Sequence, residues 1–271
     1  MNVEQYQGTI RKMRTALSDT VEYWLPIGEE EVKISELIGE NIHLQHLGAI
    51  FCIGCGRKTS KSFGQGFCYP CFRDSPHNSE CIIRPELCRG HLGEGRDSEW
   101  EQNNHNQPHV VYLAVSSGLK VGVTRETQLP TRWIDQGAWR AMKIARTPNR
   151  YEAGVIEVLL KKYISDKTAW QRMLKNELDE ELDLLQKRQF IADNFLQDHA
   201  DKICLDDEEI CTIEYPVLQY PEKVKSHNLD KNPEFQGKLT GIKGQYLLLE
   251  DGTVMNIRKY AGYEMQLEFL L

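Results

Sequence analysis

The chain has 271 residues, 40% of them hydrophobic and 27% charged, and its formal net charge is −7. This length allows a sizeable core and two or three modules. No apolar run approaches the roughly 20 residues of a membrane helix, and the N-terminus lacks the apolar stretch of a secretory signal. These features argue against a membrane protein and predict a soluble, cytoplasmic one.

The charged residues are divided between two segments of opposite sign. Residues 110–175 hold 12 Lys and Arg against five acids, whereas residues 176–214 hold 13 acids against three basic side chains. A solvated helical surface explains either excess, and the basic one also fits phosphate binding. The negative total therefore does not exclude nucleic acid as a partner.

Residues 1–50 are expected to form an N-terminal β module, because short β-like stretches alternate with glycines and no long helical period is present. A similar pattern returns within residues 203–271, where a linker and a C-terminal β module are expected. Two sets of residues recur at matching internal spacing: Gly8, Ile10 and Met13 with Gly237, Leu239 and Ile242, and Ile34, Gly39, Ile42 and Leu44 with Ile257, Gly262, Met265 and Leu267. The repeat predicts two strand sets that complete one small barrel or pack as twins.

Residues 51–108 are predicted to be a zinc-binding segment, because they are loop-rich and dense in Cys, His, Gly and Pro. Cysteines in a reducing compartment favour metal over disulfides. Two Cys-x-x-Cys pairs, Cys52 with Cys55 and Cys68 with Cys71, are separated by 12 residues. Four converging thiolates favour tetrahedral zinc over two alternatives, an iron–sulfur cluster and four buried, unligated cysteines.

A second group of metal ligands is predicted immediately after the first. Its members are Cys81, Cys88, His91 and, as the fourth ligand, His105. His105 is placed in a segment expected to be a polar loop, and His77 and His109 are the alternatives for its role. A closed structural site is favoured here, and the alternative is that the first cysteine is merely buried. The chain is therefore expected to hold one or two structural Zn²⁺ ions.

Residues 109–175 are predicted to form a domain of strands and helices. An apolar strand over residues 109–115 is followed by a turn and a second strand over residues 119–124. A helical pattern follows. Four residues stand out in this layout: Tyr112 on the first strand, Lys120 on the second, Arg132 on the next helix and Glu157 in a later helix.

The layout resembles the GIY-YIG nuclease domain, in which two strands of a small sheet carry short motifs. Val111-Tyr112-Leu113 stands where the first motif belongs and Lys120-Val121-Gly122 where the second belongs. The resemblance implies an endonuclease fold in which Glu157 holds Mg²⁺ or Mn²⁺. Both motifs depart from the family pattern, the second by Lys120 in place of tyrosine, so a nuclease relic that only binds remains an alternative.

The four residues also make chemical sense without the family name. Phosphodiester cleavage needs a proton acceptor for water, a cation beside the phosphorane and a carboxylate that holds a divalent ion. Tyr112 or Lys120 fits the first role, and Arg132 and Glu157 fit the other two. Each residue taken alone has an ordinary interpretation as a packed aromatic or a solvated charge.

Residues 176–202 are predicted to form one acidic amphipathic helix, with its apolar stripe at Leu178, Leu182, Leu185 and Phe190. A stretch punctuated by prolines then leads to the last strands. The helix offers a surface for a protein partner.

Taken end to end, the chain resembles an uncharacterised bacterial family, domain of unknown function 2797. The residues that carry this likeness are Gly66 to Phe72, Ser117 to Gly122, Pro130 to Ala138, and Asp166 to Thr168 with Trp170. The expected fold class is α+β: a GIY-YIG-like mixed sheet, preceded by zinc knuckles and flanked by β modules. Three functions follow: a metal-dependent nuclease acting on DNA or RNA, a non-catalytic zinc-containing nucleic-acid-binding protein, and a protein-interaction adaptor.

Overall fold

The computed structural model describes residues 3–165 and 167–270, so Asp166, one of the residues that carry the family likeness, lies outside the described residues. The described chain divides into two compact units. The first contains residues 3–73, 174–176 and 214–270, and the second contains residues 74–165, 167–173 and 177–213. Each unit holds one of the two cysteine groups. None of the helices in the described ranges combines the length and apolar character that a membrane crossing requires.

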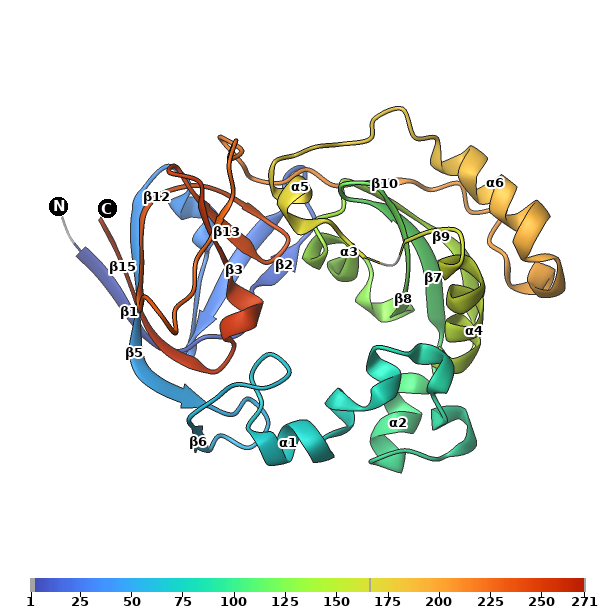
Figure 1. Ribbon diagram of the computed structural model, residues 1–271, viewed down its shortest axis with the longest axis horizontal. Helices are drawn as coiled ribbons and strands as arrows, with labels where there is room; N and C mark the ends of the chain where they lie inside the picture. The colour runs from blue at the N-terminus through green and yellow to red at the C-terminus, as the bar shows by residue number, and fades with distance from the viewer. Residues whose placement is uncertain (1–2, 166, 271) are drawn as a thin grey trace. The chain divides into compact units, whose positions relative to one another are not determined.

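The first unit is built mainly of strands (Figure 1). Its elements are β1 (Val3–Thr9), β2 (Arg14–Ala16), β3 (Glu22–Ile27), β4 (Glu30–Val32), β5 (Asn41–Phe51), β6 (Lys58–Thr59), the start of α1 (Tyr69–Asp74), β11 (Lys225–Ser226), β12 (Glu234–Lys243), β13 (Tyr246–Leu249), β14 (Thr253–Asn256) and β15 (Tyr263–Leu270). Among the described residues, one sheet has the order β1-β15-β5-β12-β13-β14-β11, with β6 paired to β5, and β2, β3 and β4 form another.

The internal repeat appears in the way the two terminal β modules pair. Gly8 lies opposite Met265 where β1 pairs with β15. Its repeat partner Gly237 lies opposite Ile42, the repeat partner of Met265, where β12 pairs with β5. The first strand of each module therefore pairs with the last strand of the other. The two modules thus contribute strands to one sheet, an arrangement that differs from both the small barrel and the packed twins that the repeat predicted.

The second unit packs helices against a smaller sheet. Its elements are α2 (Ser98–His105), β7 (His109–Val115), β8 (Leu119–Arg125), α3 (Thr131–Asp135), β9 (Arg140–Thr147), α4 (Arg150–Lys161), most of α5 (Trp170–Leu174), α6 (Leu184–Phe195) and β10 (Cys211–Thr212). The sheet order is β10-β9-β7-β8. The strands predicted over residues 109–115 and 119–124 are thus present as β7 and β8.

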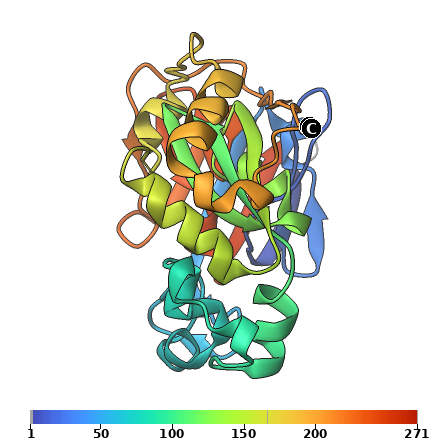
Figure 2. The ribbon, with the colours of Figure 1, turned by 90° about the vertical axis from the view of Figure 1, so that its right-hand side faces the viewer.

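The residues of β7 alternate between the two faces of this sheet. Val111 and Leu113 join an apolar cluster with Ile156 of α4 and Ile191 of α6. Figure 2 shows α4 and α6 crossing this face. Tyr112 points the other way, where its ring meets Trp133 of α3 at a centroid distance of 6.1 Å. The sheet therefore separates an apolar helix-covered face from one that carries Tyr112.

The acidic segment differs from its prediction as a single helix over residues 176–202. Residues 175–183 form a turn and irregular backbone, in which Asn176 is left-handed with φ 59°. Helix α6 begins only after Asp183, whose side chain accepts hydrogen bonds from the Leu185 and Gln186 N–H groups. Phe190, predicted on the apolar stripe, is 52% exposed.

Candidate metal centres and polar cluster

The first cysteine group lies in the first unit, where β5 ends. Cys52 and Cys55 occupy the turn that follows β5, and Cys68 and Cys71 lie at the start of α1. The turn is fixed by a hydrogen bond from the Cys52 N–H to the Arg57 carbonyl at 2.9 Å. The four sulfur atoms lie within 4.8 Å of one another.

The spacing of these sulfurs fits a tetrahedral metal ion. Zn–S bonds of about 2.3 Å place two thiolates about 3.8 Å apart around a tetrahedral centre, and the sulfurs of Cys55 and Cys68 are 3.8 Å apart. Burial acts to raise the pKa of the Cys52 thiol, but three neighbouring backbone N–H groups outweigh it and lower the pKa to about 6. The thiolate, the form that ligates metal, is thereby favoured. This group can bind a metal ion.

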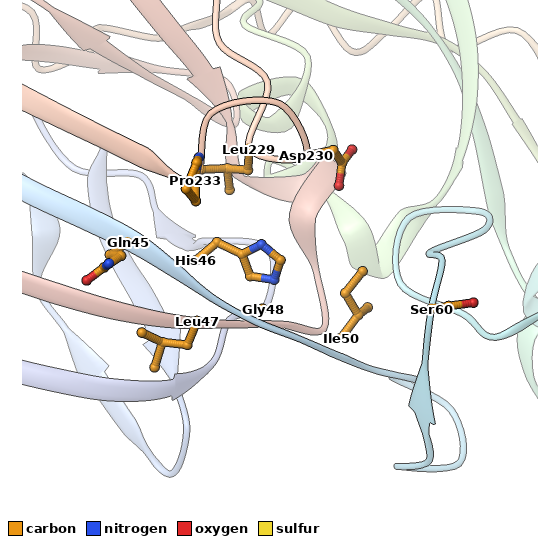
Figure 3. Close-up of a pocket in the computed structure, with 9 residues that line it drawn as sticks. All are labelled: Gln45, His46, Leu47, Gly48, Ile50, Ser60, Leu229, Asp230 and Pro233. Atoms are coloured by element: carbon orange, nitrogen blue, oxygen red, sulfur yellow. The ribbon is translucent and has the colours of Figure 1, made fainter.

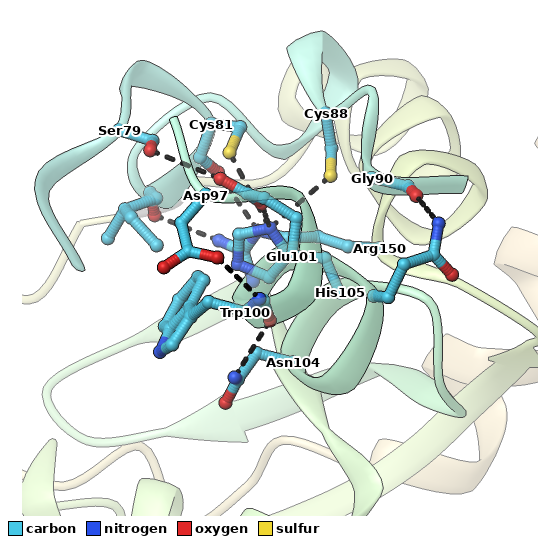
Figure 4. A network of polar contacts seen from close by, with 12 residues as sticks. Ser79, Cys81, Cys88, Gly90, Asp97, Trp100, Glu101, Asn104, His105 and Arg150 are labelled. Atoms are coloured by element: carbon cyan, nitrogen blue, oxygen red, sulfur yellow. Dashed lines mark hydrogen bonds and ion pairs between the residues drawn. The ribbon is translucent and has the colours of Figure 1, made fainter. Parts of the chain in front are cut away.

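The second group lies in the second unit and is buried (Figure 4). The sulfurs of Cys81 and Cys88, the Glu101 carboxylate and the His105 imidazole lie within 4.8 Å of one another. His105 Nδ1 is 3.8 Å from Cys81 Sγ and 3.5 Å from Cys88 Sγ. Tetrahedral zinc separates a sulfur and a nitrogen ligand by about 3.5 Å. The Glu101 carboxylate contacts the same ring nitrogen. This group can also bind a metal ion.

Helix α2 brings Glu101 and His105 to the same place, because residues four apart share one face of a helix. The polar loop predicted around His105 is wrong. The helix starts at Asp97, whose carboxylate accepts a hydrogen bond from the Trp100 N–H at 3.0 Å. An aspartate in that position is a helix start signal, and it would have indicated Glu101 as a ligand.

His91 is not part of the second group. Its ring stacks on Tyr151 with centroids 4.8 Å apart. The neighbouring Gly90 instead faces the group: a Cβ at Gly90 would lie 3.1 Å from the His105 Cβ. The two-residue spacing from Cys88 therefore does not bring His91 to the other three side chains, and the Glu101 carboxylate lies there instead.

The two alternative histidines also lie elsewhere. The ring of His77 packs against Trp100 with centroids 4.8 Å apart. His109 Nδ1 lies 2.7 Å from the Gln107 carbonyl oxygen, and burial lowers the pKa of His109 to about 3. Neither belongs to the four-residue group that can bind metal.

The thiols of the second group differ in their ionisation. A hydrogen bond from Cys81 lowers the pKa of Cys88 to about 4, although burial opposes the shift, and His105 lowers it further. The pKa of Cys81 is raised, first by its hydrogen bond to Cys88 and then by burial. These shifts favour the thiolate at Cys88 and the thiol at Cys81, so metal binding to both sulfurs would release a proton.

The loop that carries the second group packs directly on helix α4. Arg150 donates from Nε to the Cys81 carbonyl and from a terminal nitrogen to the Ile82 carbonyl, both at 2.9 Å. One turn later, a Cβ at Gly154 would lie 2.2 Å from the backbone nitrogen of Glu86. Glycine is required there because any side chain would displace the loop. The second group is thus fixed to the helix that carries Glu157.

Three of the four predicted catalytic residues share one electrostatic neighbourhood. Tyr112 is fully buried, and its hydroxyl donates to Gln136 Oε1 at 2.9 Å. Burial raises the pKa of Tyr112, the Arg132 guanidinium and Gln136 act against the rise, and the Glu157 carboxylate adds to it. The Arg132 and Glu157 charges also act on Arg150.

Lys120 lies on the same sheet face as Tyr112, two residue pairs along the two strands. Tyr112 pairs with Gly122 across the two strands, and Ala114 pairs with Lys120. The Lys120 ammonium donates to Thr168 Oγ1 at 3.1 Å and is buried. One partner of this ammonium is therefore a hydroxyl.

Glu157 is buried on α4, and its carboxylate forms an ion pair with Lys161 one turn away at 2.9 Å. The same lysine competes with any divalent ion for this carboxylate.

A separate depression of about 660 Å³ lies in the first unit (Figure 3). Its lining includes His46, Ser60 and Asp230. His46 Nε2 is 3.3 Å from the Ala49 carbonyl, and Asp230 accepts a hydrogen bond from the Tyr263 hydroxyl at 2.8 Å. Both polar side chains are thus engaged within the fold, and none of the predicted site residues contributes to the lining.

Comparison with known proteins gives one family match. A family model described as "Protein of unknown function (DUF2797)" matches residues 39–265. No curated protein and no solved structure matches the chain. The family match covers both cysteine groups and all four predicted catalytic residues.

Proposed function

We propose a nucleic-acid function for this protein, which belongs to DUF2797, a family of proteins of unknown function. In this proposal the second unit cleaves phosphodiester bonds in DNA or RNA with a divalent ion, and the two cysteine groups hold structural zinc. The observation that carries it is the shared neighbourhood of Tyr112, Arg132 and Glu157, which come from one strand and two helices. Packing of a small sheet alone does not require a phenol, a guanidinium and a carboxylate to meet there.

The proposed roles follow from the chemistry of each side chain. The Arg132 guanidinium stays charged and can donate to two phosphate oxygens. Tyr112 or Lys120 would accept the proton of the attacking water. Glu157 would hold the divalent ion, because magnesium commonly binds through one or two carboxylates together with substrate phosphates. The bound ion would supply charge stabilisation at the phosphate.

Zinc is the proposed occupant of both cysteine groups. The sulfur–sulfur and sulfur–nitrogen distances match tetrahedral ligation, and each group supplies four ligand atoms, whereas catalytic zinc keeps one position open. Mixed sulfur, nitrogen and carboxylate ligands in the second group are all ligands that zinc accepts.

The second candidate function is nucleic-acid binding without cleavage. The ion pair between Glu157 and Lys161 favours it, because the lysine already neutralises the carboxylate that would hold the metal. The buried Tyr112 hydroxyl, occupied by Gln136, favours it as well. Such a protein would bind phosphate with its basic side chains and release it unchanged.

One experiment separates the two candidates. The wild type, Glu157→Gln and Glu152→Gln are incubated with a mixed pool of DNA and RNA and with Mg²⁺ or Mn²⁺. Glu152 is the matched control because it lies on the same helix but pairs with Lys202. The nuclease proposal predicts cleavage by the wild type and Glu152→Gln, and its loss in Glu157→Gln. Cleavage that survives in Glu157→Gln contradicts the mechanism. Binding that weakens with salt, without cleavage, supports the second candidate.

A further inference from the structure

The segment around the first cysteine group has a charge unlike that of the rest of the chain. Residues 51–73 contain four Lys or Arg side chains and no Asp or Glu, in a chain of net charge −7. Four thiolates on a divalent ion carry two negative charges, which leaves this segment at about +2. We call residues 51–73 the knuckle. Its charge complements an anionic partner.

Three cations of the knuckle face solvent. Arg57, Lys58 and Lys61 are exposed. No carboxylate within residues 3–165 and 167–270 forms an ion pair with any of the three. Elsewhere in the chain, exposed cations such as Arg14 and Arg146 are paired with glutamates. The knuckle therefore presents positive charge that intramolecular carboxylates do not neutralise.

Aromatic rings lie among these cations. Tyr69, which follows the ligand Cys68, is 56% exposed. Its ring meets Phe63 edge-on with centroids 5.5 Å apart, and Lys61 Nζ lies 5.2 Å from the centre of the Phe63 ring. The metal ligands on both sides of Tyr69 hold its backbone in place. The Tyr69 ring is thus accessible, and it packs against a ring that the Lys61 ammonium contacts.

We infer that the knuckle binds single-stranded nucleic acid, with Tyr69 stacking on a base and Arg57, Lys58 and Lys61 contacting phosphates. Exposed aromatic rings can stack only on bases that are not enclosed in a duplex, and cations beside them follow the strand's phosphates. This inference deepens the proposed nucleic-acid function and rests on it. It specifies that the nucleic acid is single-stranded and that the knuckle binds it.

The test uses the full-length, metal-loaded protein without added magnesium, so that cleavage cannot interfere. Fluorescence anisotropy measures binding to a labelled oligothymidine, a duplex of equal length and a polyglutamate peptide. Tyr69→Ala is expected to raise the Kd for the oligothymidine about tenfold, as loss of one stacked base does. Tyr69→Phe keeps the ring and is expected to bind as the wild type does.

A charge-reversal variant tests the phosphate contacts. Lys58→Glu combined with Lys61→Glu is expected to weaken binding and to reduce the slope of log Kd against log salt by about 0.7 for each lost contact. Tyr163→Ala and Lys223→Glu are the matched controls, because both positions are exposed and lie outside the knuckle. The controls are expected to leave the Kd unchanged.

The outcomes distinguish this inference from the function on which it rests. If the wild type binds the oligothymidine but the knuckle variants, with metal retained, bind it equally well, the knuckle inference is wrong and the nucleic-acid function stands. Tighter binding of the duplex or of polyglutamate also overturns the inference. If the wild type binds none of the nucleic acids, the proposed function fails together with it.

Discussion

Both cysteine groups can bind a metal ion, but their surroundings differ. The first consists of four thiolates, of which Cys52 is buried, Cys68 and Cys71 are partly buried and Cys55 is exposed. The second combines two thiolates with Glu101 and His105, all buried. In the first, short turns supply every ligand. In the second, a loop and helix α2 supply the ligands, and the loop packs on helix α4.

The difference in burial implies that the first centre stabilises only its own loop, whereas the second stabilises the elements around it. An exposed metal knuckle orders its own loop, since its ligands come from residues close in sequence. A buried centre orders residues inside the core, so loss of its ion affects the elements packed against it. We therefore expect the second centre to support α4 and Glu157, and the first to leave the rest of its unit intact.

Removal of one ligand from each centre tests this comparison with the largest expected effect. Cys88→Ser is expected to lower the free energy of unfolding of the second unit by about 3–5 kcal/mol, because it leaves buried charge unbalanced. Cys55→Ser is expected to loosen residues 51–73 only. Hydrogen exchange read by mass spectrometry measures both. Equal loss of protection across α4 in the two variants would contradict the comparison.

The contact between α4 and the second centre is tested by Gly154→Ala. The added Cβ would meet the Glu86 backbone, so a loss of about 1–3 kcal/mol is expected, together with weaker metal retention at the second centre. Gly118→Ala is the control, since a Cβ there meets no atom within 4 Å. Chemical denaturation and metal content give the two readouts. Retention of wild-type stability by Gly154→Ala would show that the loop does not depend on this contact.

Thiol accessibility tests the difference in burial. After mild chelation, Cys55 is expected to react with iodoacetamide on the order of tenfold faster than Cys81 or Cys88, because Cys55 is exposed and the other two are buried. Mass spectrometry of time points gives the rates. Faster labelling of Cys88 than of Cys55 would contradict the prediction that Cys88 stays buried after chelation. It would mean that the second unit opens when its metal is lost.

The smallest expected effect is the loss of thiolate absorbance when the metal-free protein is titrated with acid. The pKa values of Cys52 and Cys88 lie below the ordinary thiol range. Each thiolate therefore persists at neutral pH and is lost as the pH falls through its pKa. The Cys52 thiolate is expected to disappear near pH 6 and the Cys88 thiolate near pH 4. Ultraviolet thiolate absorbance of the wild type minus that of Cys52→Ser or Cys88→Ser measures each. A reversed order would contradict the electrostatic account.

The sequence predicts local features of this molecule better than its long-range contacts. The first metal group depends on two tight turns, which the spacing of Cys52, Cys55, Cys68 and Cys71 specifies. The repeat likewise indicated that the terminal modules pair. Glu101 escaped prediction because its role depends on a helix start at Asp97 and on the packing of that helix against a loop. The acidic helix was overextended because charge and periodicity do not reveal that residues 177–183 are irregular and that α6 begins only after Asp183.

The catalytic quartet illustrates the same limit. The order of Tyr112, Lys120, Arg132 and Glu157 along the chain indicates which elements carry them. Their burial, and partners such as Thr168 and Lys161, depend on tertiary packing that no local pattern encodes. The resemblance to GIY-YIG nucleases remains a prediction on which the cleavage experiment decides.

X-ray absorption at the zinc edge tests the central claim, that the chain holds two metal centres of different chemistry, most directly. The variant Cys81→Ser with Cys88→Ser retains the first centre, and Cys55→Ser with Cys68→Ser retains the second. The account predicts four sulfur neighbours around zinc in the former variant, and two sulfurs with two nitrogen or oxygen neighbours in the latter. Absence of zinc from either folded variant, or identical all-sulfur shells in both, would contradict it.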